Sequence, residues 1–450
     1  MLLAGAAGAG AADKVTVVQY PLMNRPAFFR TDVNNSIVLQ CSWGSASDNW
    51  SAELALDYLT DNITLSVTDV THAAAENISY ITVSLPAGKT VYYELYDLIV
   101  TAPDGRMDEV KNAVRVMKGF SGDFSFIHLP DCHLPACNWI GDYDDPNTVT
   151  ELKQMLAEFN LLNPDFILQT GDIVDNGEEP SQYETAQGVL EMSEVPLFLT
   201  GGNHDLWKEG HRNWHTYFGT AMDYSFVYDS VRFVGLEMYD DPVSTYTPVQ
   251  MEWLQAELDA SLEAGEAGRI IFTHFDESDQ LTPDFADRFD LDAILFGHSH
   301  QNFSTTIGAG NTLKLNTSFT MNDNRQFRLV TVSGGRVSGQ TLLDAGRLDA
   351  VVSPVNDGTA LKVQATVTNG YDIGLNDLLL KLHLKNQGAV TLTGATELQH
   401  IEYDNKSRVV YYVSLDLAAG ETKTVTLKSD ALTAEPPLIT SYSPGPLPSV

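Results

Sequence analysis

The chain has 450 residues, more than one ordinary domain core accommodates, so two or three domains are expected. Its 60 acidic residues against 26 basic ones give a net charge of −34, which argues against binding to nucleic-acid duplexes or anionic lipid, because both need basic patches. Such a charge suits an extracellular or saline setting, and equally a solvated acidic surface that keeps the protein soluble.

The first segment, residues 1–14, is apolar and rich in Ala and Gly. It resembles the end of a secretory signal, in which small residues permit cleavage, but it lacks the basic residues that begin such signals. A signal remnant and a flexible leader fit it equally well. We expect an extracytoplasmic or secreted protein, with a soluble cytoplasmic one as the alternative. No apolar run of about 18 residues follows, so no transmembrane segment is expected.

Residues 15–119 alternate apolar and polar side chains in short runs, such as NITLSVTDV at 62–70. Turn sequences such as PAGKT at 86–90 separate these runs. Period-two alternation with frequent turns is typical of an all-β sandwich, so this segment is predicted to be an N-terminal, immunoglobulin-like domain.

The pattern changes over residues 120–348. Six continuous apolar runs predict strands that are buried on both faces; they lie at 124–129, 165–170, 195–200, 232–238, 269–275 and 292–297. Helical patterns occupy 148–162 and 247–262, and the second places Met251, Leu254 and Leu258 on one face. Strands that alternate with helices indicate an α/β domain.

The last hundred residues return to strand patterns. Residues 349–358 contain Pro, Asn, Asp and Gly together and are predicted to be a linker. Period-two alternation then predicts a C-terminal β-sandwich at 359–432, followed by a Pro-rich tail at 433–450. The role of the two β domains stays open; they are candidates for spacers, lids, or modules that bind a cell surface or carbohydrate.

Five strands of the α/β domain end in Asp, Asn or His. Because ligand sites in α/β sheets lie at the carboxyl ends of the strands, these side chains are expected to meet. The set comprises Asp131, His133, Asp172, Asn203, His274, His298 and His300. Oxygen and nitrogen donors of this kind suit Mn, Fe, Zn or Co. Seven donors are too many for one catalytic ion, whereas two ions that share a carboxylate use seven and leave room for water and substrate.

Each residue taken singly has a structural explanation. A lone His274 after an apolar strand is more often a satisfied core histidine than a ligand, and a lone Asp131 or Asp172 more often caps a helix or closes a turn. Five blocks in order are far more specific than one. Asp131-Cys132-His133, Gly171–Asp175, Gly201–Asp205, His274 and Gly297–His300 resemble the calcineurin-like metallophosphoesterase superfamily over about 170 residues.

That resemblance implies a core of two packed β-sheets flanked by helices and two divalent metal ions of unknown identity. It implies two ligand sets that share Asp172: Asp131, His133 and His300 complete the first, and Asn203, His274 and His298 complete the second. The reaction implied is hydrolysis of phosphate mono- or diesters by a hydroxide between the ions. His204 is implied as the electrophile or general acid, and Asp205 as the residue that orients its imidazole.

Two details of the sequence narrow the branch of the superfamily that this chain resembles. Purple acid phosphatases carry a tyrosine ligand at the position of Asp175 and GNHE in place of GNHD, so this branch is not expected. Two roles are equally open for Asp175: contact with a metal ligand from outside the ligand set, and a purely structural hydrogen bond. Cys132 is unusual in the middle of the first block, where a buried inert thiol is expected. The three cysteines, which include Cys41 and Cys137, are expected to be free, although Cys132 and Cys137 are close enough in sequence to pair.

The substrate is expected to be a small phosphate ester. Five residues after the GNHD block are candidates for the pocket rim, with a packed surface helix as the alternative: Trp207, His211, Arg212, Trp214 and His215. A nucleotidase or pyrophosphatase acting through the same site is the alternative enzyme. A surface binding protein with a scaffold phosphoesterase domain is the alternative from another class, and it is disfavoured because a scaffold is expected to have lost a ligand.

Overall fold

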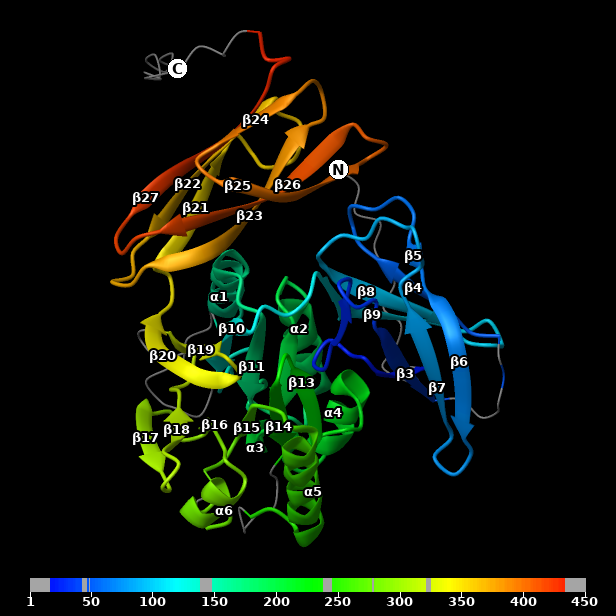
Figure 1. The fold of residues 1–450 in the computed structure, drawn as a ribbon, viewed down its shortest axis with the longest axis vertical. Helices are drawn as coiled ribbons and strands as arrows, with labels where there is room; N and C mark the ends of the chain where they lie inside the picture. Colours follow the sequence, from blue (N-terminus) through cyan, green and yellow to red (C-terminus); the bar gives the residue numbers. More distant parts are fainter. Residues whose placement is uncertain are drawn as a thin grey trace, which may run out of the picture. The chain divides into compact units, whose positions relative to one another are not determined.

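The computed structural model describes residues 17–42, 47, 49–137, 148–237, 245–276, 279–320 and 325–433 (Figure 1). The chain divides into two compact units, residues 1–348 and 349–450. The predicted leader and nearly all of the predicted tail lie outside the described residues. Among the described helices, none has the length and apolar character that crossing a bilayer requires.

The first unit begins with two β-sheets that share one core. The four-stranded sheet has the order β1 (Val18–Tyr20), β3 (Ser36–Ser42), β7 (Ile78–Ser84) and β6 (Ser66–Ala73). The five-stranded sheet has the order β2 (Ala27–Arg30), β9 (Met107–Met117), β8 (Leu95–Thr101), β4 (Ser51–Ala55) and β5 (Ile63–Thr64). Leu39 and Val83 of one sheet belong to the same buried cluster as Leu98 and Val114 of the other. The predicted strands are confirmed, and the immunoglobulin-like topology stays a prediction.

Two further sheets form the rest of this unit. One has the order β12 (Leu197–Thr200), β11 (Phe166–Thr170), β10 (Asp123–Leu129), β19 (Gln326–Ser333) and β20 (Arg336–Asp344). The other has the order β13 (Tyr224–Tyr228), β14 (Val231–Leu236), β15 (Gly268–Thr273), β16 (Ala293–Phe296), β18 (Thr312–Asn316) and β17 (Phe303–Ile307). Strands β10, β11 and β12 are parallel to one another, as are β14, β15, β16 and β18. All six predicted apolar strands are therefore present.

An aromatic core joins the two sheets. The rings of Phe126 on β10 and Phe233 on β14 meet edge to face, with centroids 5.6 Å apart. Continuous apolar runs form these strands because each strand is covered on both faces. On the far side of the first sheet, Phe159 of α1 (Thr148–Leu162) packs against Phe327 of β19. On the far side of the second, Leu254 of α5 (Pro248–Ala264) shares a cluster with Ile271 of β15.

The two predicted helices form where sequence signals mark their ends. The α5 helix is preceded by Thr247, whose side chain accepts a hydrogen bond from the Gln250 N–H, and Pro248 occupies its first turn. It ends at Gly265, whose φ of 71° terminates the helix without steric cost. Three further helices were not predicted: α2 (Pro180–Leu190), α3 (Asn203–Leu206) and α6 (Pro283–Arg288). A fourth, α4 (Gly210–Phe218), lies where a packed surface helix was the alternative to a pocket rim.

The second unit contains two sheets. One has the order β21 (Leu348–Ser353), β22 (Lys362–Asn369), β27 (Thr422–Ser429) and β24 (Val390–Thr393), and the other β23 (Leu375–Lys385), β26 (Arg408–Leu417) and β25 (Thr396–Tyr403). The predicted linker at 349–358 therefore begins inside strand β21. Hydrogen bonding to β22, which depends on the tertiary structure, makes these residues a strand despite the turn-forming residues that follow.

Candidate metal centre

The carboxyl ends of five strands deliver the predicted ligands to one place. Asp131 and His133 follow β10, Asp172 follows β11, and Asn203 begins α3 after β12. From the second sheet, His274 follows β15, and His298 and His300 follow β16. Because the strands of each sheet are parallel here, their ends lie at the same edge, and the two edges meet.

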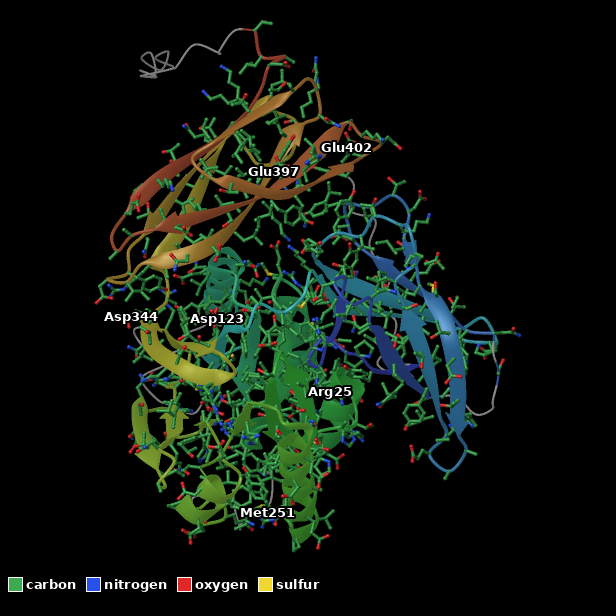
Figure 2. All side chains as sticks on the ribbon, in the orientation of Figure 1. Arg25, Asp123, Met251, Asp344, Glu397 and Glu402 are labelled. Carbon is green, nitrogen blue, oxygen red and sulfur yellow. The ribbon has the colours of Figure 1, made fainter. Side chains whose placement is uncertain are left out.

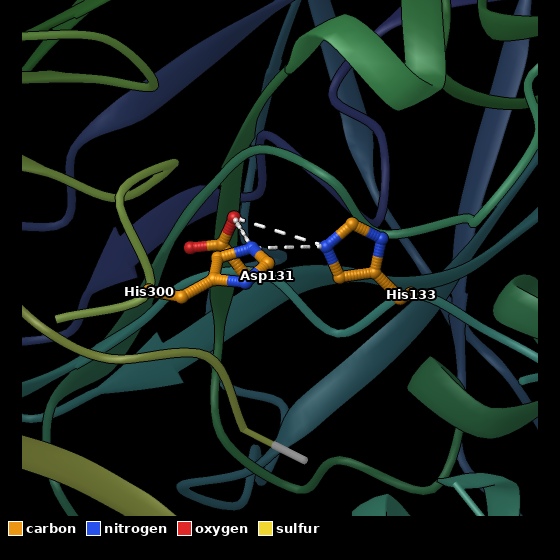
Figure 3. Close-up of side chains that lie close together, drawn as sticks. All are labelled: Asp131, His133 and His300. Carbon is orange, nitrogen blue, oxygen red and sulfur yellow. Dashed lines mark hydrogen bonds and ion pairs between the residues drawn. The ribbon is translucent and has the colours of Figure 1, made fainter. Parts of the chain in front are cut away.

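One group of donors is formed by Asp131, His133 and His300 (Figure 3). The Nε2 atoms of His133 and His300 are 3.4 Å apart, and His300 Nε2 is 3.4 Å from Asp131 Oδ1. Asp131 and His133 are fully buried. The three side chains point at one another although they come from two different sheets. Their donor atoms are thus gathered as one metal ion requires.

A second group is formed by Asp172, His274 and His298. Asp172 Oδ2 lies 3.1 Å from His274 Nε2, and it lies 3.8 Å from His133 Nε2 of the first group. One carboxylate oxygen therefore faces both groups. Asn203 adds an amide oxygen, because its Oδ1 is 3.1 Å from His274 Nε2. The structure thus brings all seven predicted side chains together.

The backbone at this site is unusual. Five of the seven residues have a φ in the left-handed region: 52° at Asp131, 46° at His133, 55° at Asp172, 63° at His298 and 53° at His300. This conformation is uncommon for residues with a side chain, and a fold retains it where the surrounding structure enforces it. Concentrated at one sheet edge, it indicates that the fold is built to aim these side chains inward.

Two glycines allow the loops to approach one another. A Cβ atom on Gly297 would lie 2.6 Å from Asp131 Oδ2, and one on Gly202 would lie 2.3 Å from Asp172 Oδ1. Any larger residue would displace a predicted ligand. The glycines of the GNHD and GHxH blocks therefore provide space for the carboxylates.

The charge at the site fits a cation. Burial lowers the pKa of His133 to about 3 and that of His298 to about 4, so both rings are neutral donors near pH 7. Burial acts to raise the pKa of Asp172, but the nearby histidines, His274 above all, hold it well below its ordinary value. In the described residues, the ionic partners of Asp131 and Asp172 are histidines alone. Two buried carboxylates beside the neutral imidazoles of His133 and His298 match divalent ions.

At His274 a metal ion would compete with a proton for the ring nitrogen Nε2. Burial acts to lower the pKa of His274, but the charge of Asp172 and the hydrogen bond with it raise that pKa to about 9. The ring also bonds through Nδ1 to the Thr170 carbonyl at 2.7 Å, which leaves Nε2 directed at the donor cluster.

His204 lies beside the two groups, and its ring is 4.7 Å from that of His133. Its Nδ1 bonds to the carbonyl of Asp175 at 2.6 Å. Asp205 was expected to orient this imidazole, but the structure shows no hydrogen bond between the two side chains among the described residues. The Asp205 carboxylate instead accepts backbone N–H bonds from Val174 and Gly202, at 3.0 and 2.9 Å. One of these N–H groups precedes α3 and the other lies in the loop after β11, so the carboxylate connects the two loops.

Asp175 and Cys132 take supporting positions. Asp175 Oδ1 is 3.7 Å from His133 Nδ1, on the side of that ring away from the donor group. Cys132 is fully buried, and burial raises the pKa of its thiol to about 12, so it is the inert thiol that was expected. All three cysteines are free.

The predicted rim residues fall into two kinds. Trp214 is buried in α4 and packs against Phe218, so it is a core residue. Trp207 is 48% exposed, and its ring lies under the ammonium group of Lys208. Arg212 pairs with Glu209 on the surface. The interpretation of this segment as a packed surface helix is supported for Trp214 and Arg212.

The sequence patterns did not reveal the segment that supports the histidine loop. Asn316 donates to the Gly297 carbonyl at 2.9 Å, and Ser318 donates to the His300 carbonyl at 2.8 Å. The Phe319 ring stacks on that of His300, with centroids 4.5 Å apart. Residues 316–319 comprise the last residue of β18 and the three after it and contain no recognisable motif, so only the three-dimensional structure identifies them.

Comparisons with known proteins agree with this geometry. Residues 124–302 match the model of the calcineurin-like phosphoesterase family. A probable cyclic nucleotide phosphodiesterase from Ruthia magnifica subsp. Calyptogena magnifica is 30% identical over 82 residues, which are 18% of this chain and 33% of that protein. Another, from Vesicomyosocius okutanii subsp. Calyptogena okutanii (strain HA), is 24% identical over 193 residues, which are 40% of this chain and 79% of that protein.

The chain thus spans about a third of the first relative's length and most of the second's. Among solved structures, a dimetal phosphatase from Danio rerio is similar with a TM-score of 0.39 and 12% identity, over 49% of this chain and 98% of that chain. The matched segment contains all seven predicted ligands. The match to the family model therefore identifies residues 124–302 as a calcineurin-like phosphoesterase domain.

Proposed function

We propose that this chain is a phosphoesterase that uses two divalent metal ions to hydrolyse small phosphate mono- or diesters. The observation that carries the proposal is the position of Asp172. Its Oδ2 atom faces His133 of one donor group and His274 of the other, at 3.8 and 3.1 Å. A carboxylate between two gathered ligand sets is the arrangement by which two ions are held side by side.

The residues present divide between the two ions. Asp131, His133, Asp172 and His300 would hold one, and Asp172, Asn203, His274 and His298 would hold the other. Mn, Fe, Zn and Co all suit these oxygen and nitrogen donors. When bound, the ions supply an activated water and neutralise the charge of the phosphate group.

His204 is proposed to deliver the proton that the leaving oxygen needs. Because the Asp175 carbonyl accepts a bond from Nδ1, that nitrogen carries a proton and Nε2 is the atom that exchanges a proton with substrate. The His204 backbone N–H also donates to Asp172 Oδ1 at 2.8 Å, which ties the acid to the shared carboxylate. Proton donation by such a group typically contributes about 10²–10⁴-fold to the rate.

Cyclic nucleotides are the first substrates to test, because both similar proteins carry the name of probable cyclic nucleotide phosphodiesterases. A diester preference would show as faster hydrolysis of bis-p-nitrophenyl phosphate than of p-nitrophenyl phosphate. Each is assayed after the protein has been treated with chelator and then supplied with Mn, Fe, Zn or Co. We expect turnover that is lost with the chelator and returns with metal.

The opposite results have clear meanings. Preference for the monoester, with nucleotides or pyrophosphate turned over faster than cyclic nucleotides, would replace the diesterase with a nucleotidase or pyrophosphatase. If the chain binds metal and turns over none of these compounds with any metal, it is a binding protein built on the phosphoesterase fold.

A further inference from the structure

A series of buried polar side chains, linked by hydrogen bonds, lies behind the metal centre and is not part of the proposed chemistry. It begins at Arg328 on β19, whose side chain is only 3% exposed. Among the described residues, its guanidinium donates to neutral acceptors alone: Thr317 Oγ1 at 3.3 Å, the Asn316 carbonyl at 2.9 Å, and Gln340 Oε1. A buried cation costs free energy, so one held by neutral groups calls for an explanation.

The series of polar contacts continues from Arg328 to the fully buried His128 on β10. Thr317 Oγ1 is 2.8 Å from His128 Nδ1, and His128 Nε2 is 2.9 Å from Thr170 Oγ1. The carbonyl of Thr170 in turn accepts the Nδ1 bond of His274, at 2.7 Å. The polar contacts thus connect β19, the segment after β18, β10 and β11 with one predicted metal ligand.

Chemistry fixes the direction of the first of these hydrogen bonds. A guanidinium can only donate, so Thr317 Oγ1 accepts from Arg328 and keeps its own proton and a second lone pair for the contact with His128 Nδ1. His128 has a partner at each ring nitrogen, Thr317 at Nδ1 and Thr170 at Nε2, so in the neutral ring one nitrogen donates and the other accepts. Arg328 supplies the one fixed donor of this series of contacts, and neighbouring hydrogen bonds in such a buried series polarise one another.

The same segment also holds the other ligand loops. The Asn316 side chain donates to the Gly297 carbonyl and to Ser299 Oγ, at 2.9 and 2.8 Å. Thr320 donates to the Asp131 carbonyl through its Oγ1, at 3.2 Å. Because Arg328 bonds the Asn316 carbonyl and the Thr317 hydroxyl, it fixes the segment from which these contacts start.

We propose that Arg328 and Thr317 are positioning residues of the metal centre. Arg328 orders the 316–320 segment and the hydrogen bonds of His128, and these hold the loops of Asp131, His274, His298 and His300 at binding distance. The inference rests on the proposed metal centre, and it concerns how tightly the ions are held. Loss of an outer hydrogen-bonding partner of metal ligands typically costs about 10–100-fold in metal affinity.

The sharpest test uses Thr317, which differs from valine by one hydroxyl at nearly the same volume. Thr317→Val removes the link between Arg328 and His128, whereas Thr317→Ser keeps a hydroxyl and is the matched control. Zn²⁺ affinity is measured by competition with a chromophoric chelator, and zinc content by elemental analysis. We expect the valine variant to bind zinc about 10–100-fold more weakly and the serine variant to stay within a few-fold of wild type.

A second pair separates positioning from simple destabilisation. Arg269 is also buried, but it lies at the start of β15, opposite the strand end that carries His274, and bonds the Phe289 carbonyl and Asp290. Arg328→Met and Arg269→Met are both expected to lower the thermal midpoint of the metal-free protein. Only Arg328→Met is expected to lower zinc affinity.

Three outcomes are decisive. Weaker zinc binding in Thr317→Val and Arg328→Met, but not in their controls, supports the inference. Equal zinc affinity in wild type and Thr317→Val, or an equal loss in Arg269→Met, overturns it while leaving the proposed function intact. Failure of the wild-type chain to bind zinc, manganese or cobalt would overturn the metal centre itself.

Discussion

His204 and Asp205 are neighbours in the chain, yet the structure gives them separate tasks. The imidazole of His204 lies among the donor groups, whereas the Asp205 carboxylate is fully buried and bonds two backbone N–H groups. His204→Ala should therefore keep both metal ions and lower kcat by about 10²–10⁴-fold. Elemental analysis beside steady-state kinetics checks this, and a metal content that falls with the activity would contradict the role.

Asp205→Asn is the contrasting change at the next residue. An asparagine places an amide N–H₂ where a carboxylate oxygen now accepts from Val174 or Gly202. Leaving a buried donor unsatisfied costs roughly 1–3 kcal/mol, so the free energy of unfolding should fall by about that amount. Urea denaturation measures it. Unchanged stability with a lost acid limb in the pH profile of kcat would instead restore the orienting role.

Glu237 is a further residue whose burial has a measurable effect. Burial raises the pKa of Glu237 to about 7, and the charge of Asp223 adds to this effect. The pKa of a glutamate in the unfolded state is about 4.3. Between these values the unfolded state loses its proton first, so the side chain increasingly disfavours folding as the pH rises. Glu237→Gln should therefore stabilise the protein more at pH 8 than at pH 5.5, by about 2 kcal/mol.

Urea denaturation at the two pH values tests this change. The matched control is Glu263→Gln, which removes one negative charge from an exposed position on α5. An equal gain in both variants would show that the net charge, and not the burial of Glu237, is responsible.

At the scale of elements, the turn after β1 covers the edge of strand β12. The Leu199 N–H donates to the Asn24 carbonyl at 3.2 Å, and Tyr224 of β13 donates to the Leu199 carbonyl at 2.9 Å. Arg25, labelled in Figure 2, places its guanidinium over the Tyr224 ring, 5.6 Å from its centroid. Strand β12 leads directly into Asn203 and His204, so these contacts support the strand that delivers both residues.

Tyr224→Phe should accordingly loosen β12. The lost hydroxyl leaves the Leu199 carbonyl without one donor, so amide hydrogens in residues 197–200 should exchange faster, and kcat should fall severalfold as His204 becomes less well placed. Tyr228→Phe on the same strand is the matched control, because that hydroxyl donates to Asp165 instead. If both variants exchange alike, the effect belongs to β13 and not to β12.

At the scale of the whole molecule, every predicted ligand lies in the first unit. That unit needs its last residues, because the buried Glu158 carboxylate of α1 accepts N–H bonds from Gly346, Arg347 and Leu348. A chain that ends at Ser353 should bind two ions and keep its turnover. A chain that ends at Asp344 loses these three bonds and should have a lower thermal midpoint.

Calorimetry and elemental analysis of both truncated chains give the comparison. Loss of metal binding in the chain that ends at Ser353 would mean that the second unit contributes to the centre.

Strand and helix patterns in the sequence predicted the elements that carry the site, because strands buried on both faces leave continuous apolar runs and α5 has a capping sequence at each end. The short helix α3 left no comparable signal, because it is a single turn formed by the loop after β12. Loop residues such as Ser318 act through backbone contacts that no local pattern encodes.

The sequence by itself predicted the seven donors and the order in which strands present them, because Asp, Asn and His offer oxygen and nitrogen atoms to a metal and, after a strand, can reach the sheet edge. Only the tertiary structure decided which groups face one another. It turned Asp205 toward backbone amides, aimed His204 Nδ1 at a carbonyl, and placed Arg328 beneath the histidine loop. Hydrogen-bond partners between distant segments depend on how two sheets pack, and that information is not local.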